Sequence, residues 1–208
     1  MLKKYYKMNN PLIKSIISSV IYSDKEFFNA ISELYGFEDI DLDPCYSKGN
    51  FYRELSFEPK YRFDIEPIRK ECQKADCRNL PLANESINTI VFDPPFMFGT
   101  HGQTKNNIMN KRFSMFDTFE ELENMYKESL IEFWRILKKG GYLFFKCQDY
   151  TDSKTTMTHC LVYNWAAELG FYAKDIAILV KPNKVTNPNT KQRHLRKIHT
   201  YFWVFIKS

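Results

Sequence analysis

The chain of 208 residues carries a net charge of +5 and has a pI near 8.8. This length favours one domain with a substantial core, and the mild positive charge weakly favours a polyanionic partner. No apolar stretch approaches the length of a membrane span, and no apolar run of secretory length follows the basic start MLKKYYKMNN. We therefore expect a cytoplasmic protein with no membrane partner.

The first 36 residues predict two helices. Pro11 suits the first turn of a helix, and apolar residues then recur at helical spacing as far as Val20. Ser23 and Asp24 interrupt this pattern and provide an N-cap for a second helix. The apolar positions are Ile13, Ile16, Ile17 and Val20 in the first helix, and Phe27, Phe28, Ile31 and Leu34 in the second.

Six short apolar runs predict strands at residues 37–42, 61–65, 87–92, 142–146, 176–180 and 201–206. Helical patterns at 118–138, capped by Asp117 or Thr118, and at 155–169 alternate with them. Such alternation indicates a parallel sheet covered on both faces. The last two runs are joined by a polar loop without a helix, so they should pair antiparallel. We expect a single domain, residues 1–208, with N-terminal helices at 1–36 and an α/β core at 37–208.

Cysteine and histidine usage does not predict a metal site. The five cysteines are odd in number and lack paired zinc spacing. We interpret them as free thiols in a reducing compartment. His194 and His199 have no second pair of ligands in the sequence, so we expect them to contact phosphate or solvent.

Ligands of an open α/β sheet bind outside the carboxyl ends of the strands, and acidic residues follow the first three predicted strands. Asp43 ends the first and is followed by a turn that includes Gly49. Asp64 lies 21 positions later, where an acid can accept hydrogen bonds from ribose hydroxyls. Asp76 could accept from the exocyclic amine of an adenine. Taken singly, each of these could also be an ordinary strand end.

The stretch NTIVFDPPFMFGT ends a buried strand with Asp93-Pro94-Pro95-Phe96. The two prolines cannot continue a central ladder, and they hold the chain rigidly. If the Asp93 carboxylate and the Pro94 carbonyl each accept one hydrogen of an aryl amine, its nitrogen lone pair is freed to attack an electrophile. Phe96 can stack on the base. We expect Asp93 to face the mouth of the sheet and not to be held in an ion pair.

These segments resemble the S-adenosylmethionine-dependent amino-methyltransferases of nucleic acids, and most of all the small DNA adenine-N6 methyltransferases of bacteria and their phages. The resemblance covers roughly residues 37–207 and rests on the DPPF motif and on the order of the acids before it. It implies a Rossmann-like class I methyltransferase fold, with a seven-stranded, mostly parallel sheet, an antiparallel last strand and helices on both faces. It also implies a catalytic group of Asp93, Pro94, Pro95 and Phe96.

The resemblance further implies that S-adenosyl-L-methionine is the cofactor. The family's cofactor turn reads Asp-Pro-x-x-Gly-x-Gly, and here Ser47 replaces the first glycine. Lys48 is placed to meet the methionine carboxylate, Asp64 the ribose and Asp76 the adenine. The implied cofactor-binding residues are Asp43, Pro44, Cys45, Ser47, Lys48, Gly49, Asp64, Asp76 and Cys77.

Two long polar segments, 97–116 and 181–200, predict nucleic-acid contacts because polar loops of this length in a compact domain are usually functional or mobile. Their cations can pair phosphates. We expect DNA contacts from Lys105, Lys111, Arg112, Lys184, Lys191, Arg193, Arg196 and Lys197. No segment is large enough for a separate target-recognition domain, so a homodimer or a partner subunit stays open.

The expected activity is methylation of the N6 amine of adenine in DNA. Since the target atom is buried in a duplex, the base must be flipped out or single-stranded. Three alternatives stay open: an RNA base methyltransferase acting on guanine N2 or adenine N6, a DNA cytosine-N4 methyltransferase, and a non-catalytic nucleic-acid-binding partner subunit.

Overall fold

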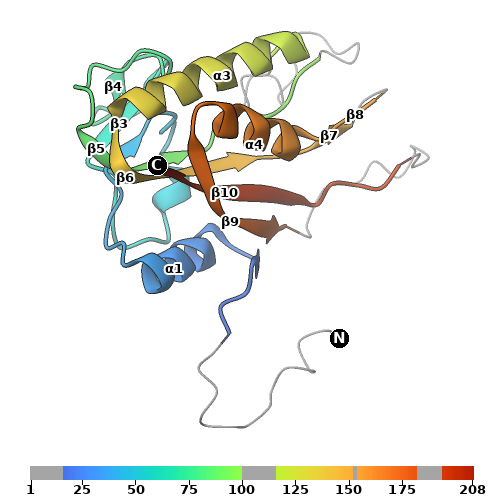
Figure 1. Cartoon of the computed structure of the whole chain (residues 1–208), viewed down its shortest axis with the longest axis horizontal. Helices are drawn as coiled ribbons and strands as arrows, with labels where there is room; N and C mark the ends of the chain where they lie inside the picture. The colour runs from blue at the N-terminus through green and yellow to red at the C-terminus, as the bar shows by residue number, and fades with distance from the viewer. Residues whose placement is uncertain (1–15, 100–115, 152–153, 182–193) are drawn as a thin grey trace, which may run out of the picture.

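The computed structural model describes residues 16–99, 116–151, 154–181 and 194–208. In chain order the elements are β1 (Val20–Ile21), α1 (Asp24–Tyr35), β2 (Leu42–Asp43), the 3-10 turn η2 (Asn50–Tyr52), β3 (Tyr61–Asp64), β4 (Gln73–Lys74), β5 (Ile87–Phe92), α3 (Phe119–Ile136), β6 (Leu137–Cys147), β7 (Tyr150–Thr151), β8 (Thr155–Thr156), α4 (Thr158–Glu168), β9 (Phe171–Val180) and β10 (His199–Lys207). Figure 1 shows their arrangement.

The main sheet has the strand order β1-β9-β10-β6-β5-β2-β3-β4. All neighbours pair in parallel except β10, which is antiparallel to both β6 and β9. The α/β class and the reversed last strand are therefore confirmed. The expected seven strands form the series from β9 to β4, and β1 adds an eighth at the edge.

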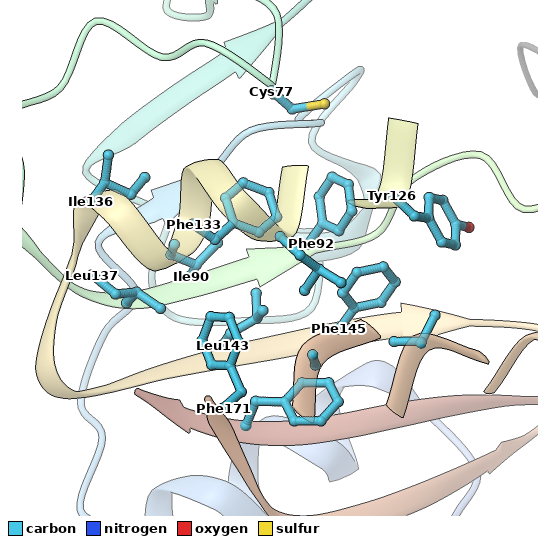
Figure 2. Packing of buried hydrophobic residues seen from close by; sticks show 14 of the residues in the cluster. Cys77, Ile90, Phe92, Tyr126, Phe133, Ile136, Leu137, Leu143, Phe145 and Phe171 are labelled. Carbon is cyan, nitrogen blue, oxygen red and sulfur yellow. The ribbon is translucent and has the colours of Figure 1, made fainter. Parts of the chain in front are cut away.

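Helices cover both faces of the sheet (Figure 1). On one face, α3 and α4 pack on β5, β6 and β10, and Figure 2 shows this aromatic-rich core. On the other face, α1 packs on the opposite sides of the same strands. Because both faces are covered, neighbouring residues on β6 such as Phe144 and Phe145 are both fully buried. This explains why the central strands read as unbroken apolar runs.

The α3 helix forms where its sequence pattern predicts. Thr118 has an extended backbone, and its side chain accepts a hydrogen bond from the N–H of Glu121 at 3.2 Å. Leu122, Tyr126 and Leu130 recur at helical spacing and are fully buried. Capping satisfies a free N–H of the first turn, and the buried stripe docks the helix on the sheet.

The expected helix before Ser23 is wrong over its described part, residues 16–22. Val20 and Ile21 instead form β1, which pairs in parallel with Ile178 and Leu179 of β9. Both residues are β-branched and fit a strand, and the edge of β9 offers hydrogen-bond partners that a sequence pattern cannot show. Residues 1–15, which include Pro11 and Ile13, lie outside the described residues.

Other boundaries also differ. Of the run at 37–42, only Leu42 joins Asp43 in a strand, whereas β6 and β9 each begin five residues before the expected start. Between β2 and β5, the 3-10 turn η2 is the only helical element among the described residues. No described helix is long and apolar enough to cross a membrane.

Candidate active site

Four acids follow four adjacent strands of the sheet. In spatial order they are Asp93 after β5, Asp43 at the end of β2, Asp64 at the end of β3 and Asp76 after β4. These strands are parallel, so their carboxyl ends lie along one edge. The structure therefore brings together the acids that the sequence analysis singled out.

Asp43 shows how closely the acids lie. Its carboxylate is 2% exposed. Its pKa is raised to about 7, chiefly by burial and also by the negative charges of Asp93 and Asp64, against the lowering effect of hydrogen bonds from Cys45 and Tyr52. The first bond joins the Cys45 N–H to Oδ1 and the second joins the Tyr52 hydroxyl to Oδ2, each at 2.8 Å. The buried side chain of Asp43 thus holds both Cys45 in the turn and Tyr52 after it by hydrogen bonds.

The turn after Asp43 has two residues in left-handed backbone conformations, Ser47 with φ 52° and Gly49 with φ 64°. Ser47 occupies the place of a family glycine and nevertheless adopts the backbone that suits glycine. A Cβ on Gly49 would lie 2.5 Å from the hydroxyl oxygen of Tyr46. Ser47 and Lys48 are exposed, while Pro44 and Gly49 are buried. The replacement of a glycine by Ser47 therefore preserves the turn.

Asp64 ties this turn to β3. Its Oδ2 accepts the N–H of Ser47 at 2.9 Å, and its Oδ1 accepts the N–H of Glu66 at the same distance. A carboxylate has about four acceptor sites, so each oxygen retains capacity for a hydroxyl donor. Asp64 is partly exposed, which suits its expected role toward a ribose.

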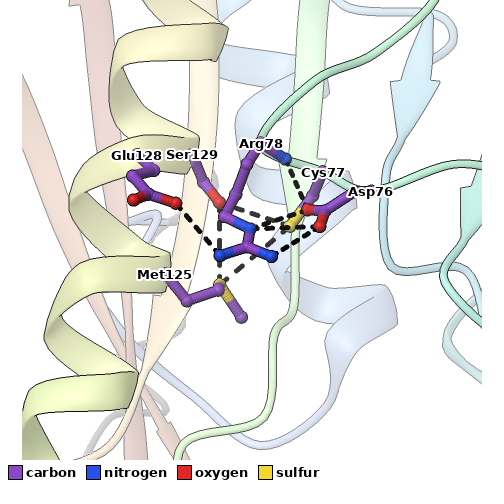
Figure 3. A network of polar contacts seen from close by, with 6 residues as sticks. All are labelled: Asp76, Cys77, Arg78, Met125, Glu128 and Ser129. Atoms are coloured by element: carbon purple, nitrogen blue, oxygen red, sulfur yellow. Dashed lines mark hydrogen bonds and ion pairs between the residues drawn. The ribbon is translucent and has the colours of Figure 1, made fainter.

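Asp76 is engaged in an ion pair (Figure 3). Its two oxygens accept hydrogen bonds from the Arg78 guanidinium at 2.7 to 3.1 Å, and Arg78 also bonds Glu128 of α3 at 3.0 Å. The hydrogen bonds from Arg78 lower the pKa of Asp76 even though burial opposes this. Asp76 is therefore a fixed anion anchored to α3, and its contact with adenine stays a prediction.

The two cysteines expected at the cofactor site lie together. Cys77 is buried, and its Sγ is 3.3 Å from Ser129 Oγ. A hydrogen bond between the Cys45 and Cys77 thiols, together with burial, raises the pKa of Cys45. The loops that follow β2 and β4 are therefore in contact through these two cysteines.

Asp93 is in an ion pair, which corrects the expectation that it would be unpaired. Its Oδ2 lies 3.0 Å from Nζ of Lys146, the residue beside it on β6. The Asp93 side chain is still 27% exposed, whereas that of Lys146 is 7% exposed. Lys146 also bonds Asp24 at 3.1 Å. Asp93 is thus held from the buried side and remains accessible from the other.

In the tetrad Asp93-Pro94-Pro95-Phe96, α3 holds Pro95. The Tyr126 hydroxyl donates to the carbonyl oxygen of Pro95 at 2.9 Å. Among the described residues, none donates a hydrogen bond to the carbonyl oxygen of Pro94. Phe96 is partly exposed. Within the described part of the chain, the tetrad therefore combines a rigid backbone, one carbonyl held by a hydrogen bond and one carbonyl without a donor.

Only two of the cations expected to contact nucleic acid are described. Arg196 is exposed, and Lys197 donates to Thr151 Oγ1 of the β7–β8 hairpin at 2.8 Å. They lie just before β10, whose antiparallel direction places its start at the carboxyl edge of the sheet. Lys105, Lys111, Arg112, Lys184, Lys191 and Arg193 lie outside the described residues.

Sequence reasoning missed three residues of the site: Lys146, Tyr126 and Tyr52. The sequence could have indicated a partner for Lys146, because this lysine lies inside the apolar run YLFFKC and burial of an unpaired charge costs free energy. Tyr126 lies on the buried stripe of α3, but helical periodicity could not predict that its hydroxyl reaches the tetrad.

The comparison with protein families matches a DNA methylase family model to residues 87–208, from the start of β5 to the end of the chain. This segment contains the tetrad, whereas the turn at 43–49 precedes it. The comparison with curated proteins gave no significant match.

Solved structures share the fold. A SAM-dependent methyltransferase from Methanosarcina mazei matches with 14% identity over 85% of this chain and 96% of its own, with a TM-score of 0.50. A provisionally assigned DNA modification methylase from Thermus thermophilus, complexed with S-adenosyl-L-methionine, matches with 19% identity over 64% of this chain and 53% of its own, with a TM-score of 0.46. The chain thus spans about half the length of the Thermus protein.

The fold is that of class I methyltransferases that use S-adenosylmethionine. The family model covers more than half of the sequence and begins at the strand that carries the tetrad. The chain therefore belongs to the DNA methylase family.

Proposed function

We propose that this protein transfers a methyl group from S-adenosyl-L-methionine to the exocyclic N6 amine of adenine in DNA. The observation that carries the proposal is the position of Asp93-Pro94-Pro95-Phe96. The tetrad ends β5 beside β2, so that Asp93 lies within electrostatic reach of Asp43 in the turn. Membership of the DNA methylase family supports methylation of a nucleic acid.

The geometry of the tetrad suits an aryl amine. Lys146 occupies Oδ2 of Asp93, which leaves Oδ1 for one amine hydrogen, and the Pro94 carbonyl can accept the other. Two such bonds draw the nitrogen toward tetrahedral geometry and orient its lone pair. Stacking of the base on Phe96 would contribute about 1–3 kcal/mol.

The cofactor would supply an electrophilic methyl group on a cationic sulfur. The amine nitrogen, oriented by Asp93 and Pro94, would form its bond to this methyl carbon as the carbon–sulfur bond breaks; the electron pair would stay on sulfur, and the amine proton would then leave to water. No strong base is needed, because the proton becomes acidic only after methylation.

The strand ends fit this cofactor. A cationic sulfur is stabilised near carboxylates, and Asp93 after β5 and Asp64 at the end of β3 supply negative charge on either side of β2. Asp64 holds the Ser47 N–H and keeps acceptor capacity for hydroxyls. Lys48 is exposed on the same turn, where it can pair the methionine carboxylate. Asp76 and Cys77 follow β4 at the far end of the acidic row, which is consistent with an adenine subsite.

Adenine is favoured over cytosine because the tetrad begins with Asp, whereas cytosine-N4 enzymes more often begin it with Ser. The test is transfer of tritium from labelled cofactor to DNA and to RNA, followed by nucleoside analysis. We expect label in N6-methyladenine of DNA. Label in N4-methylcytosine would refute the choice of base, and label only in RNA would refute the choice of nucleic acid.

Asp93→Ala tests the role of the tetrad. We expect the transfer rate to fall at least about 100-fold, since a preorganised polar contact to the reacting group is lost, while the affinity for S-adenosylmethionine stays largely intact. Calorimetric titration measures that affinity. Asp175→Asn is the control, because Asp175 on β9 bonds Tyr35 and does not contact the tetrad. A collapse of cofactor affinity equal to the loss in rate would show that Asp93 does not act on the base.

A further inference from the structure

Lys146 is a buried cation directly behind the tetrad. It is 6% exposed, and its Nζ lies 3.0 Å from Asp93 Oδ2 and 3.1 Å from Asp24 Oδ1. The ammonium also lies over the rings of Phe51 and Phe202, at 4.8 and 5.1 Å from their centroids. Two carboxylates and two aromatic faces thus fix the position of one charged group.

Stability alone does not explain this arrangement. Burial of an ion pair carries a desolvation penalty of several kcal/mol per ion, and well-packed apolar residues often serve stability equally well. Burial lowers the pKa of Lys146, but the charges of Asp93 and Asp24 outweigh this and keep it above its ordinary value. Lys146 is therefore a permanent cation whose charge acts on Asp93.

We propose that Lys146 is a positioning residue for methyl transfer, which holds one oxygen of Asp93 so that the other faces the amine of the target base. The proposal rests on the function proposed above. It gives the tetrad two anchors, since the Tyr126 hydroxyl fixes the carbonyl of Pro95 on the other side. Pro94 lies between Asp93 and Pro95 in the chain, so the hydrogen bonds that hold these two residues also restrict the direction of the Pro94 carbonyl.

The anchor extends beyond the tetrad. Asp24 begins α1, and its second oxygen bonds Lys181 at 3.1 Å. Lys181 follows β9 and begins the polar segment 181–200, which we expect to contact nucleic acid. The Lys146 ammonium thus bonds Asp93 and Asp24 directly, and it is linked through Asp24 to Lys181 at the start of the polar segment.

Removal of the ammonium frees Asp93 to rotate. A displacement of a reacting group by about 1 Å can lower a rate about 100-fold. We expect Lys146→Met to lower the single-turnover rate constant at saturating DNA and cofactor at least about tenfold. The dissociation constant of S-adenosylmethionine and the KM for DNA should stay within about twofold, because Lys146 contacts neither the turn nor the polar segment directly.

Lys207→Met is the matched control. Lys207 is also a buried lysine, bonded to Glu85 at 3.2 Å and to the carbonyl of Leu137 at 2.8 Å, and it lies over the ring of Trp134. Lys207 lies beside the amino ends of β6 and β9, away from the carboxyl ends where the tetrad lies. Its loss should therefore lower stability and leave the rate constant within about twofold. A wild-type rate constant for Lys146→Met, or equal losses for both variants, would overturn the proposal. If Lys146→Met does not fold, Lys146→Gln replaces it with the same expected loss.

A second measurement does not need activity. In NMR spectra of lysine ammonium groups, two carboxylate partners should slow proton exchange of Lys146 enough to detect its signal in the free protein. Asp93→Asn should shift or broaden that signal, and Lys207 should be unaffected. An unchanged Lys146 signal refutes the inference. If the wild-type protein methylates no base, the proposed function fails and this measurement alone decides whether Lys146 holds Asp93.

Discussion

Replacement of the buried carboxyl group of Asp43 should change how stability depends on pH. Asn is the suitable substitution, because its amide oxygen can accept the Cys45 N–H and its amide N–H can donate to the Tyr52 hydroxyl. Asp43→Asn therefore removes the ionisation and keeps the shape of the turn.

The magnitude follows from the pKa of Asp43, which folding raises from 3.8 to about 7, chiefly through burial. Because the folded state holds the proton more tightly, the contribution to stability is complete below about pH 3.8 and is lost as the pH rises through about 7. At about 1.4 kcal/mol per pKa unit, the wild-type protein should lose about 2–3 kcal/mol relative to Asp43→Asn between pH 5 and pH 8.

Urea unfolding at several pH values, followed by tryptophan fluorescence, measures this loss. The other titrating groups are common to both proteins, so the difference in the free energy of unfolding isolates Asp43. We expect the difference to shift in favour of Asp43→Asn as the pH rises. A difference that is equal at pH 5 and pH 8 would refute the reasoning that burial raises the pKa of this carboxyl group.

Two further predictions concern the turn after Asp43 and the aspartate bonded to it. Gly49→Ala should destabilise the protein by about 1–3 kcal/mol, because the residue has φ 64° and its new Cβ would meet Tyr46; an unchanged unfolding midpoint would contradict this. Asp64→Ala should weaken S-adenosylmethionine binding at least about tenfold, through loss of the ribose acceptor and of the bond to the Ser47 N–H. The rate at saturating cofactor should change less, and calorimetry that finds wild-type affinity would exclude Asp64 from the site.

The sequence predicted the parts of the site that follow from local chemistry. The prolines of the tetrad end β5 at the expected residue, and Asp43, Asp64 and Asp76 follow successive strands as expected. The helix expected at 118–138 and Thr118, one of its two candidate N-caps, are also confirmed. Each of these features depends on backbone rules or on a period that is visible within one segment.

Other features depend on partners distant in the sequence. Val20 and Ile21 form a strand because the edge of β9 is available, although their spacing also fits a helix. Asp93 is paired because β6 places Lys146 beside it, 53 residues away. Arg78, the partner of Asp76, is also held by Glu128 of α3, 50 residues away. None of these contacts can be inferred from the residues on either side.

By itself, the sequence determined the α/β architecture, the strand ends and the kinds of chemical group at them, because proline geometry, helical periodicity and the alternation of elements act over short stretches of chain. Only the tertiary structure decided how those groups are engaged: Asp43 buried with a raised pKa, Asp93 held by Lys146, and Pro95 held by Tyr126. Ion pairing and desolvation act through space, so these properties became defined only when strands distant in sequence were placed side by side.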